Sequence, residues 1–165
     1  MYGIDAGGDM KSWGIYIIAA LGFAIYGAVT DADRDSTGAI VDGGNVDAFN
    51  IRVGDCFDDS SSYDAEVNSL PGVPCSQPHD NETYAVFDVT VSSYPDDDAM
   101  AELANESCLE RFESFVGKDY QSSTLEIMTL YPTAQSWRQD DHEVVCAVYD
   151  MNAAKLEGSV KGRAL

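Results

Sequence analysis

The longest apolar stretch of the chain lies near its start, at residues 12–30, where nineteen consecutive residues carry no charge. As a helix rising about 1.5 Å per residue, this run would measure roughly 28 Å, enough to cross the hydrocarbon core of a bilayer. Trp13 and Tyr26 lie near its two ends, where aromatic rings suit a membrane interface. A signal peptide is the alternative, but the run is longer than a usual signal core and no small-residue cleavage site follows. We predict a transmembrane helix at 12–30, preceded by a cytoplasmic segment at 1–11.

Small residues recur along this predicted helix and could form a packing face. Ala20, Ala24 and Ala28 are spaced four apart, with Gly27 beside them. Small residues on one face of a membrane helix allow the backbone of another helix to approach closely. The pattern therefore predicts contact with a helix of another membrane subunit, although a plain anchor would also tolerate it.

Residues 31–50 show little hydrophobic periodicity and are rich in Asp and Gly. This composition predicts an acidic linker between the helix and a folded domain. Alternate aspartates from Asp31 to Asp35, with Asp42, match four positions of a calcium-binding loop. Position six of that loop is normally Gly and here is Ser36, which favours solvated linker acids.

From residue 51 onward the pattern changes to short β-type segments and one helical segment. Met100 to Val116 places apolar residues near a period of 3.6, with Asp96–Asp98 as a start signal and Gly117 as a stop. The β-branched and aromatic runs predict strands, at residues 51–57, 83–91, 125–131 and 143–149, with a short last strand at 156–160. The predicted fold class is α+β: one main helix packed on a small, mostly antiparallel sheet, in an extracytoplasmic domain at 51–165.

The charge balance excludes some partners. Nine Lys and Arg face 29 Asp and Glu, a formal net charge of −20. Nucleic-acid binding and docking on anionic lipids both depend on basic side chains, so neither is expected. Basic protein surfaces are the partners that such a domain would attract.

All four cysteines follow the apolar run, at Cys56, Cys75, Cys108 and Cys146. An even, well-separated set without a C-x-x-C motif predicts two disulfides and an oxidising, extracytoplasmic location, with four buried thiols as the alternative. Of the three possible pairings we favour Cys56–Cys75 and Cys108–Cys146. The first would close one local loop, and the second would join the helix to a late strand.

Few residues offer chemistry. His79 and Glu82 lie three apart after Pro78, but a catalytic zinc needs three protein ligands and His142 is the only other imidazole. Nucleophile, phosphate-binding and haem motifs are absent from the sequence. We therefore interpret His79 and Glu82 as a structural turn bonded to the local backbone, and we expect no catalytic residue, metal or cofactor.

Several short motifs resemble those of the actinobacterial septum formation domain family. They are Val53-Gly-Asp-Cys-Phe57, the block Pro74-Cys-Ser-Gln-Pro-His-Asp-Asn-Glu82, and Leu156-Glu-Gly-Ser159, together with Cys108, Trp137 and Cys146. The resemblance covers about residues 51–162. It implies a membrane helix followed by an extracytoplasmic domain, a location in the cell envelope and a link to division, without a well-established enzymatic mechanism.

These observations favour a non-catalytic, single-pass accessory subunit that docks onto a larger membrane complex, for which a respiratory cytochrome assembly is the candidate. The first alternative is an envelope factor associated with septum formation. The second is an exported hydrolase with an unrecognised site.

Overall fold

The computed structural model describes residues 30–59 and 67–165. The predicted segments at 1–11 and 12–30, with the small-residue face of Ala20, Ala24, Gly27 and Ala28, lie outside these residues apart from Thr30. Within the described residues, no helix combines the length and the apolar character needed to cross a bilayer. Residues 31–165 form one compact unit.

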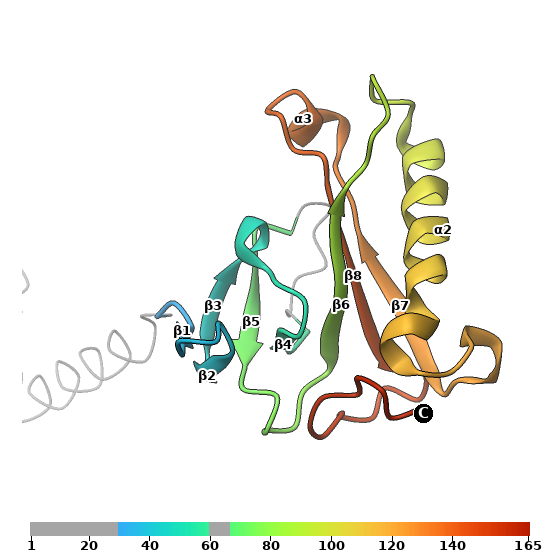
Figure 1. The fold of residues 1–165 in the computed structure, drawn as a ribbon. Coiled ribbons are helices and arrows are strands. Elements are labelled where there is room, and N and C mark those ends of the chain that lie inside the picture. Colours follow the sequence, from blue (N-terminus) through green and yellow to red (C-terminus); the bar gives the residue numbers. More distant parts are fainter. Residues whose placement is uncertain (1–29, 60–66) are drawn as a thin grey trace, which may run out of the picture. The chain divides into compact units, whose positions relative to one another are not determined.

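Six strands form the main sheet, in the order β3-β5-β4-β6-β8-β7 with antiparallel neighbours throughout (Figure 1). β6 and β8 make the longest pairing and contribute buried Val, Ala and Tyr residues. The strands are β3 (Gly44–Asp47), β4 (Cys56–Phe57), β5 (Ser69–Val73), β6 (Asn81–Asp88), β7 (Leu125–Leu130) and β8 (Glu143–Asp150).

The main helix, α2 (Asp97–Val116), begins and ends where the sequence predicts. The Asp96 carboxylate accepts a hydrogen bond from the Ala99 N–H at 2.8 Å, and Gly117 ends the helix in the left-handed conformation at φ 84°. One stripe of the helix packs on the sheet and is buried: Met100, Ala104, Cys108, Phe112, Phe115 and Val116. The prediction of one helix on an antiparallel sheet is confirmed.

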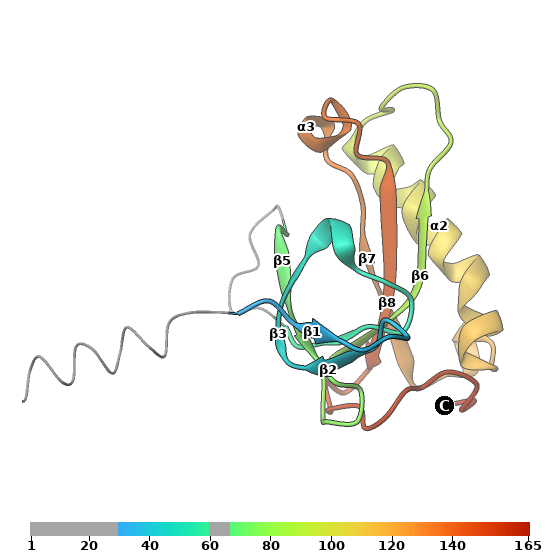
Figure 2. The ribbon, with the colours of Figure 1, turned by 60° about the vertical axis from the view of Figure 1, so that its left-hand side comes forward.

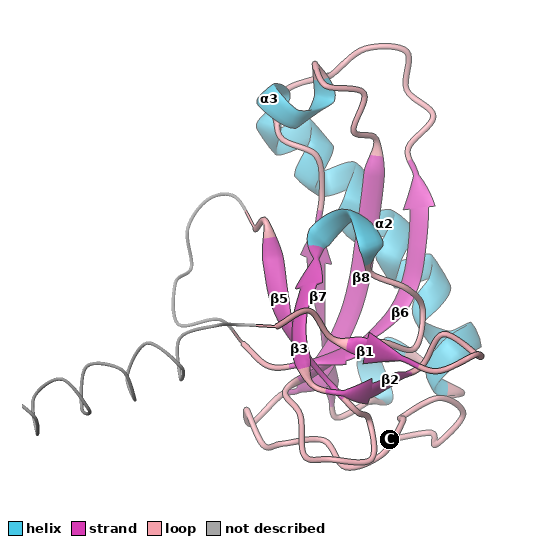
Figure 3. Cartoon of the chain, turned by 90° about the vertical axis from the view of Figure 1, so that its left-hand side faces the viewer, coloured by secondary structure: helices cyan, strands magenta, loops and turns pink. Residues whose placement is uncertain are grey.

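The opposite face of the sheet is covered by the segment that the composition assigns to a linker. β1 (Asp33–Arg34) and β2 (Ile40–Asp42) form a hairpin, and β3 joins the main sheet. Figures 2 and 3 show this hairpin and α2 on different sides of the sheet. Ile40 of the hairpin and Val46 of β3 belong to a second apolar core, together with Ile51, Phe57, Leu70, Val145 and Ala147.

The prediction of a linker at 31–50 is therefore wrong, and the folded domain begins at about residue 31. Two widely spaced apolar residues of the segment, Ile40 and Val46, and Ile51 directly after it, anchor it to the sheet. An aspartate that composition marks as solvated instead closes a turn, because the Asp35 carboxylate accepts hydrogen bonds from the Thr37 N–H and hydroxyl at 2.8 and 2.6 Å.

Other boundaries also differ from expectation. The strand expected at 51–57 is reduced to Cys56–Phe57, and the one expected at 156–160 is a single bridge between His79 and Leu156. The short helical elements are η1 (Ala48–Asn50), η2 (Tyr120–Ser122) and α3 (Ala134–Trp137).

Both predicted disulfides are present. Cys56 at the start of β4 pairs with Cys75 in the turn after β5, and Cys108 of α2 pairs with Cys146 of β8. The second bond ties α2 to β8, so the main helix is covalently joined to the sheet on which it packs.

Candidate functional site

The buried polar side chains gather at one end of the sheet. Asp55, His79, Asn81, Glu82 and Thr83 are the buried polar residues of the described chain. They come from the end of the loop before β4 and from the turn and first residues of β6. Because burying a polar group without a partner is costly, the contacts of each group decide what this cluster can do.

Glu82 holds the C-terminal segment of the domain. Its side chain is fully buried, and its two carboxylate oxygens accept hydrogen bonds from the Ser159 hydroxyl and the Val160 N–H, both at 2.6 Å. The expectation that Glu82 bonds to the local backbone is therefore wrong, since its partners lie 77 and 78 residues later. The carboxylate joins β6 to a segment that has no regular secondary structure of its own.

His79 is also fully buried, and its polar atoms are only partly partnered. Its Nδ1 lies 2.8 Å from the Gln77 carbonyl oxygen, so Nδ1 carries the proton and donates it there. Its backbone N–H and carbonyl form a bridge with Leu156 at 3.1 and 2.8 Å. Nε2 has no hydrogen-bond partner among the described residues.

One group of side chains in the described residues could share a metal ion. Donor atoms of Cys56, His79 and Glu82 all lie within 4.8 Å of one another. The Cys56 sulfur is committed to the disulfide and offers no thiolate, which leaves one nitrogen and a carboxylate that already accepts two hydrogen bonds. A zinc site needs at least three protein ligands, so the oxidised domain does not fit a bound metal. His142 lies apart from this group, with its ring against Trp137 at 4.0 Å between centroids.

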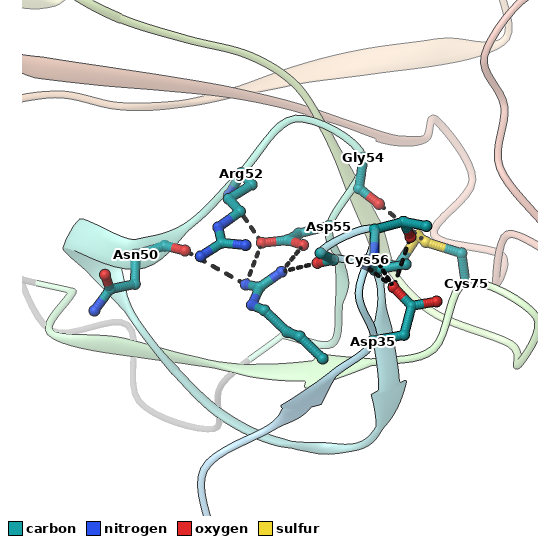
Figure 4. A network of polar contacts seen from close by, with 11 residues as sticks. Asp35, Asn50, Arg52, Gly54, Asp55, Cys56 and Cys75 are labelled. Carbon is teal, nitrogen blue, oxygen red and sulfur yellow. Dashed lines mark hydrogen bonds and ion pairs between the residues drawn. A yellow bond between two sulfur atoms is a disulfide. The ribbon is translucent and has the colours of Figure 1, made fainter.

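An ion pair between Arg34 and Asp55, which the sequence analysis did not predict, lies at the same end of the sheet. The Arg34 guanidinium donates to both oxygens of the Asp55 carboxylate, at 2.6 and 2.7 Å, and Asp55 is almost fully buried. Asp55 also accepts a hydrogen bond from the Arg52 N–H at 2.8 Å (Figure 4). The hydrogen bonds to Asp55 raise the pKa of Arg34 above its usual value. Arg34 comes from β1, so this pair fastens the hairpin to the domain.

The three family-like motifs meet around these contacts. The Gly54 N–H donates to the Thr83 carbonyl and the Thr83 N–H donates to the Asp55 carbonyl, both at 2.8 Å, while Glu82 binds Ser159. The Cys56–Cys75 disulfide links the first of these motifs covalently to the second. His79 and Glu82 are completely shielded from solvent, so a dissolved substrate has no direct access to either side chain. The geometry is that of a cross-link between three distant segments.

Replacing Arg34 by Gln should destabilise the domain by about 3 kcal/mol, because it leaves the Asp55 carboxylate buried without its counter-ion. Urea unfolding of the full-length chain, followed by circular dichroism, would measure this loss. Lys155→Gln is the matched control: Lys155 pairs with Asp58 and Asp80 at a half-exposed position, where an ion pair contributes little. Equal effects of the two substitutions would contradict the importance of the Arg34 pair.

Glu143 gives the domain a pH dependence of its own. Burial raises the pKa of the Glu143 carboxyl above 4.5, and the nearby carboxylates of Asp88 and Asp141 add to the effect. The charged form is disfavoured in the folded state, so this penalty is present at neutral pH and disappears as pH falls through the raised pKa. Glu143→Gln should therefore raise the Tm at pH 7 and leave it nearly unchanged at pH 4. The exposed Glu110, changed to Gln, controls for the loss of one charge from an acidic protein.

Comparison with known proteins supports one of the functional alternatives. The model of the septum formation family matches residues 34–163, which includes the β1–β3 segment upstream of the motifs. No curated protein and no solved structure matched the chain. The match favours the division-associated alternative, and it gives no support to a subunit of a respiratory cytochrome assembly.

Proposed function

Because this chain belongs to the septum formation family, we propose that it is a cell-envelope protein that serves septum formation by docking other proteins. The family match over residues 34–163 carries this proposal. In this role the domain acts on the outer side of the membrane and performs no catalysis.

The two disulfides support an extracytoplasmic location. All four cysteines are paired, and three of them are completely buried. Disulfides persist in oxidising compartments and are rare in the cytoplasm. The predicted helix at 12–30 would then anchor the domain, with residues 1–11 on the cytoplasmic side.

The contacts of the titratable groups support a non-catalytic role. The Glu82 carboxylate and the Asp55 carboxylate each hold two or more donors of the fold, and the cysteines are in bridges. A general base or a nucleophile must reach its substrate within hydrogen-bond distance, which complete burial prevents. This disfavours the exported-hydrolase alternative at the His79–Glu82 position.

The septum-formation proposal and the accessory-subunit interpretation both assign a docking role to this protein. They differ in the partner, which is the division machinery in the first and a respiratory complex in the second. The predicted helix face of Ala20, Ala24, Gly27 and Ala28 would serve either partner equally well. The family match supports a partner in the division machinery.

Depletion of the protein in its native host tests the proposal. We expect longer cells with fewer or misplaced septa, restored by the wild-type chain, and unchanged oxygen uptake. Normal septa together with reduced oxygen uptake would contradict the proposal and support the respiratory alternative.

A further inference from the structure

β7 is an open edge of the main sheet. Among the described residues it pairs with β8 alone, over Leu125–Leu130 without a register shift. The other edge is covered, because the Ala32 N–H bonds to the Asn45 carbonyl of β3 at 2.9 Å. β7 also lacks the Lys, Pro or bulge with which proteins usually protect a free edge.

The pairing shows which backbone groups of β7 point outward. The Met151 N–H donates to the Thr124 carbonyl at 3.0 Å, and antiparallel strands alternate between bonded and non-bonded pairs. The Leu125 N–H accordingly turns away from β8 and donates to the Ser123 hydroxyl at 3.0 Å. By the same alternation, the N–H and carbonyl groups of Ile127 and Thr129 face the free edge.

A small, open hollow lies beside these groups. It has a volume of about 270 Å³ and is lined by Asn105 and Leu109 of α2 and by Tyr120 and Ile127. Leu109 is 47% exposed, although it lies on the helix that carries the main core. Figure 1 shows β7 at the α2 side of the sheet. A strand added to β7 would direct alternate side chains toward this hollow.

The net charge of the domain favours a basic partner. α2 carries a single base, Arg111, and six acidic residues: Asp97, Asp98, Glu102, Glu106, Glu110 and Glu113. From residue 31 onward the chain has 27 acids and 8 bases, a net charge of 8 − 27 = −19. A second copy of this chain would be repelled, whereas a basic segment would be attracted.

We propose that the free edge of β7 binds an extended, basic segment of a partner protein, which adds to the sheet as a further strand. Its apolar side chains, at every second position, enter the hollow between α2 and β7. Its basic side chains point to the opposite face of the sheet and are attracted by the net negative charge of the domain. This inference rests on the proposed docking function and names the surface and the chemistry of the partner.

A fluorescent heptapeptide of alternating Lys and Val is the probe, titrated with the full-length chain and followed by anisotropy. We expect saturable binding that weakens with added salt. A Glu–Val peptide of the same length should not bind, because its charge is reversed. The same Lys–Val peptide with N-methylated valines, which lacks the inner N–H donors, should bind at least about tenfold more weakly.

Thr129→Pro removes an outward N–H and leaves the bonds to β8 in place, so it should weaken peptide binding at least about tenfold. Thr129→Val keeps the N–H and should bind like wild type. Leu109→Ala, which enlarges the exposed hollow without touching the strand, should weaken binding as well, whereas Val53→Ala, at a residue 52% exposed elsewhere, should not.

Absence of binding up to about 1 mM peptide, or equal affinity of wild type and of the Thr129 and Leu109 variants, would overturn the proposal. Self-association of the wild type that Thr129→Pro abolishes would overturn it in favour of a second copy. Each of these results would leave the septum phenotype of the depleted cells unaffected, so the wider functional proposal is tested separately.

Discussion

Replacing Glu82 by Ala should lower the free energy of unfolding by about 4 kcal/mol. The substitution removes the acceptor for the Val160 N–H and the Ser159 hydroxyl, and it opens a cavity at a fully buried position. Hydrogen bonds to a charged group contribute about 1.5–3 kcal/mol each, and an orphaned buried N–H adds its own cost. The C-terminal segment would lose its attachment to β6.

Two further substitutions separate the contributions. Ser159→Ala removes one of the two hydrogen bonds and should cost about 2 kcal/mol. Glu82→Gln keeps the shape and one acceptor, so its cost should lie between those of the other two variants. Urea unfolding of all three at constant pH provides the values. A loss below about 1 kcal/mol for Glu82→Ala would show that the Glu82 contacts contribute little to the fold.

Removing the Cys108–Cys146 bridge is the second large effect. The bonded residues are 38 apart in sequence, and in the chain-entropy model a closed loop of this length stabilises by about 4 kcal/mol. The double substitution to Ala also removes buried sulfur atoms from the interface of α2 and β8. We expect a loss of at least about 4 kcal/mol, with α2 more exposed to hydrogen exchange than the strands.

The Cys56–Cys75 bridge is the internal control. It spans 19 residues, so its removal should cost about 3 kcal/mol, and it should affect the hairpin side of the sheet more than α2. Thermal unfolding of the two double variants under oxidising conditions gives the comparison. The expectation fails if the shorter loop proves the more stabilising bridge.

The elements that could be predicted from the sequence carry their own local signals. α2 has an aspartate cap, a 3.6-residue apolar stripe and a terminal Gly117, and β7 and β8 are rich in β-branched residues. The disulfide pairing followed from the same elements, since one bridge closes a loop and the other joins α2 to β8. Local propensity and tertiary structure agree at these positions.

Elements without such signals were missed. β5 reads Ser69-Leu-Pro-Gly-Val73, in which Pro71 and Gly72 are typical of a turn. Gly72 is nevertheless required inside the strand, because a Cβ there would lie 2.5 Å from the Val46 side chain. The acidic residues around β1 to β3, such as Asp35 and Asp47, are typical of a solvated linker but here accept hydrogen bonds within turns. Packing against the sheet determines the conformation of these strands, and this packing cannot be recognised from a single sequence.

The candidate site likewise combines local contacts that the sequence indicated with long-range contacts that it did not. His79 and its contact with the Gln77 carbonyl are local, and the sequence indicated a turn there. The pairs Arg34–Asp55 and Glu82–Ser159 join residues 21 and 77 apart, and no spacing rule reports such contacts. The resemblance to the family marked Asp55, Glu82 and Ser159 as motif residues without showing that they meet.

We propose that the protein lies in the cell envelope and acts at the forming septum. Fluorescence microscopy of a functional fusion in dividing cells of the native host tests it most directly. We expect a band at the division site that appears with the septum, and that band should remain in a strain whose respiratory cytochromes are depleted. Uniform labelling of the envelope throughout the division cycle would contradict it.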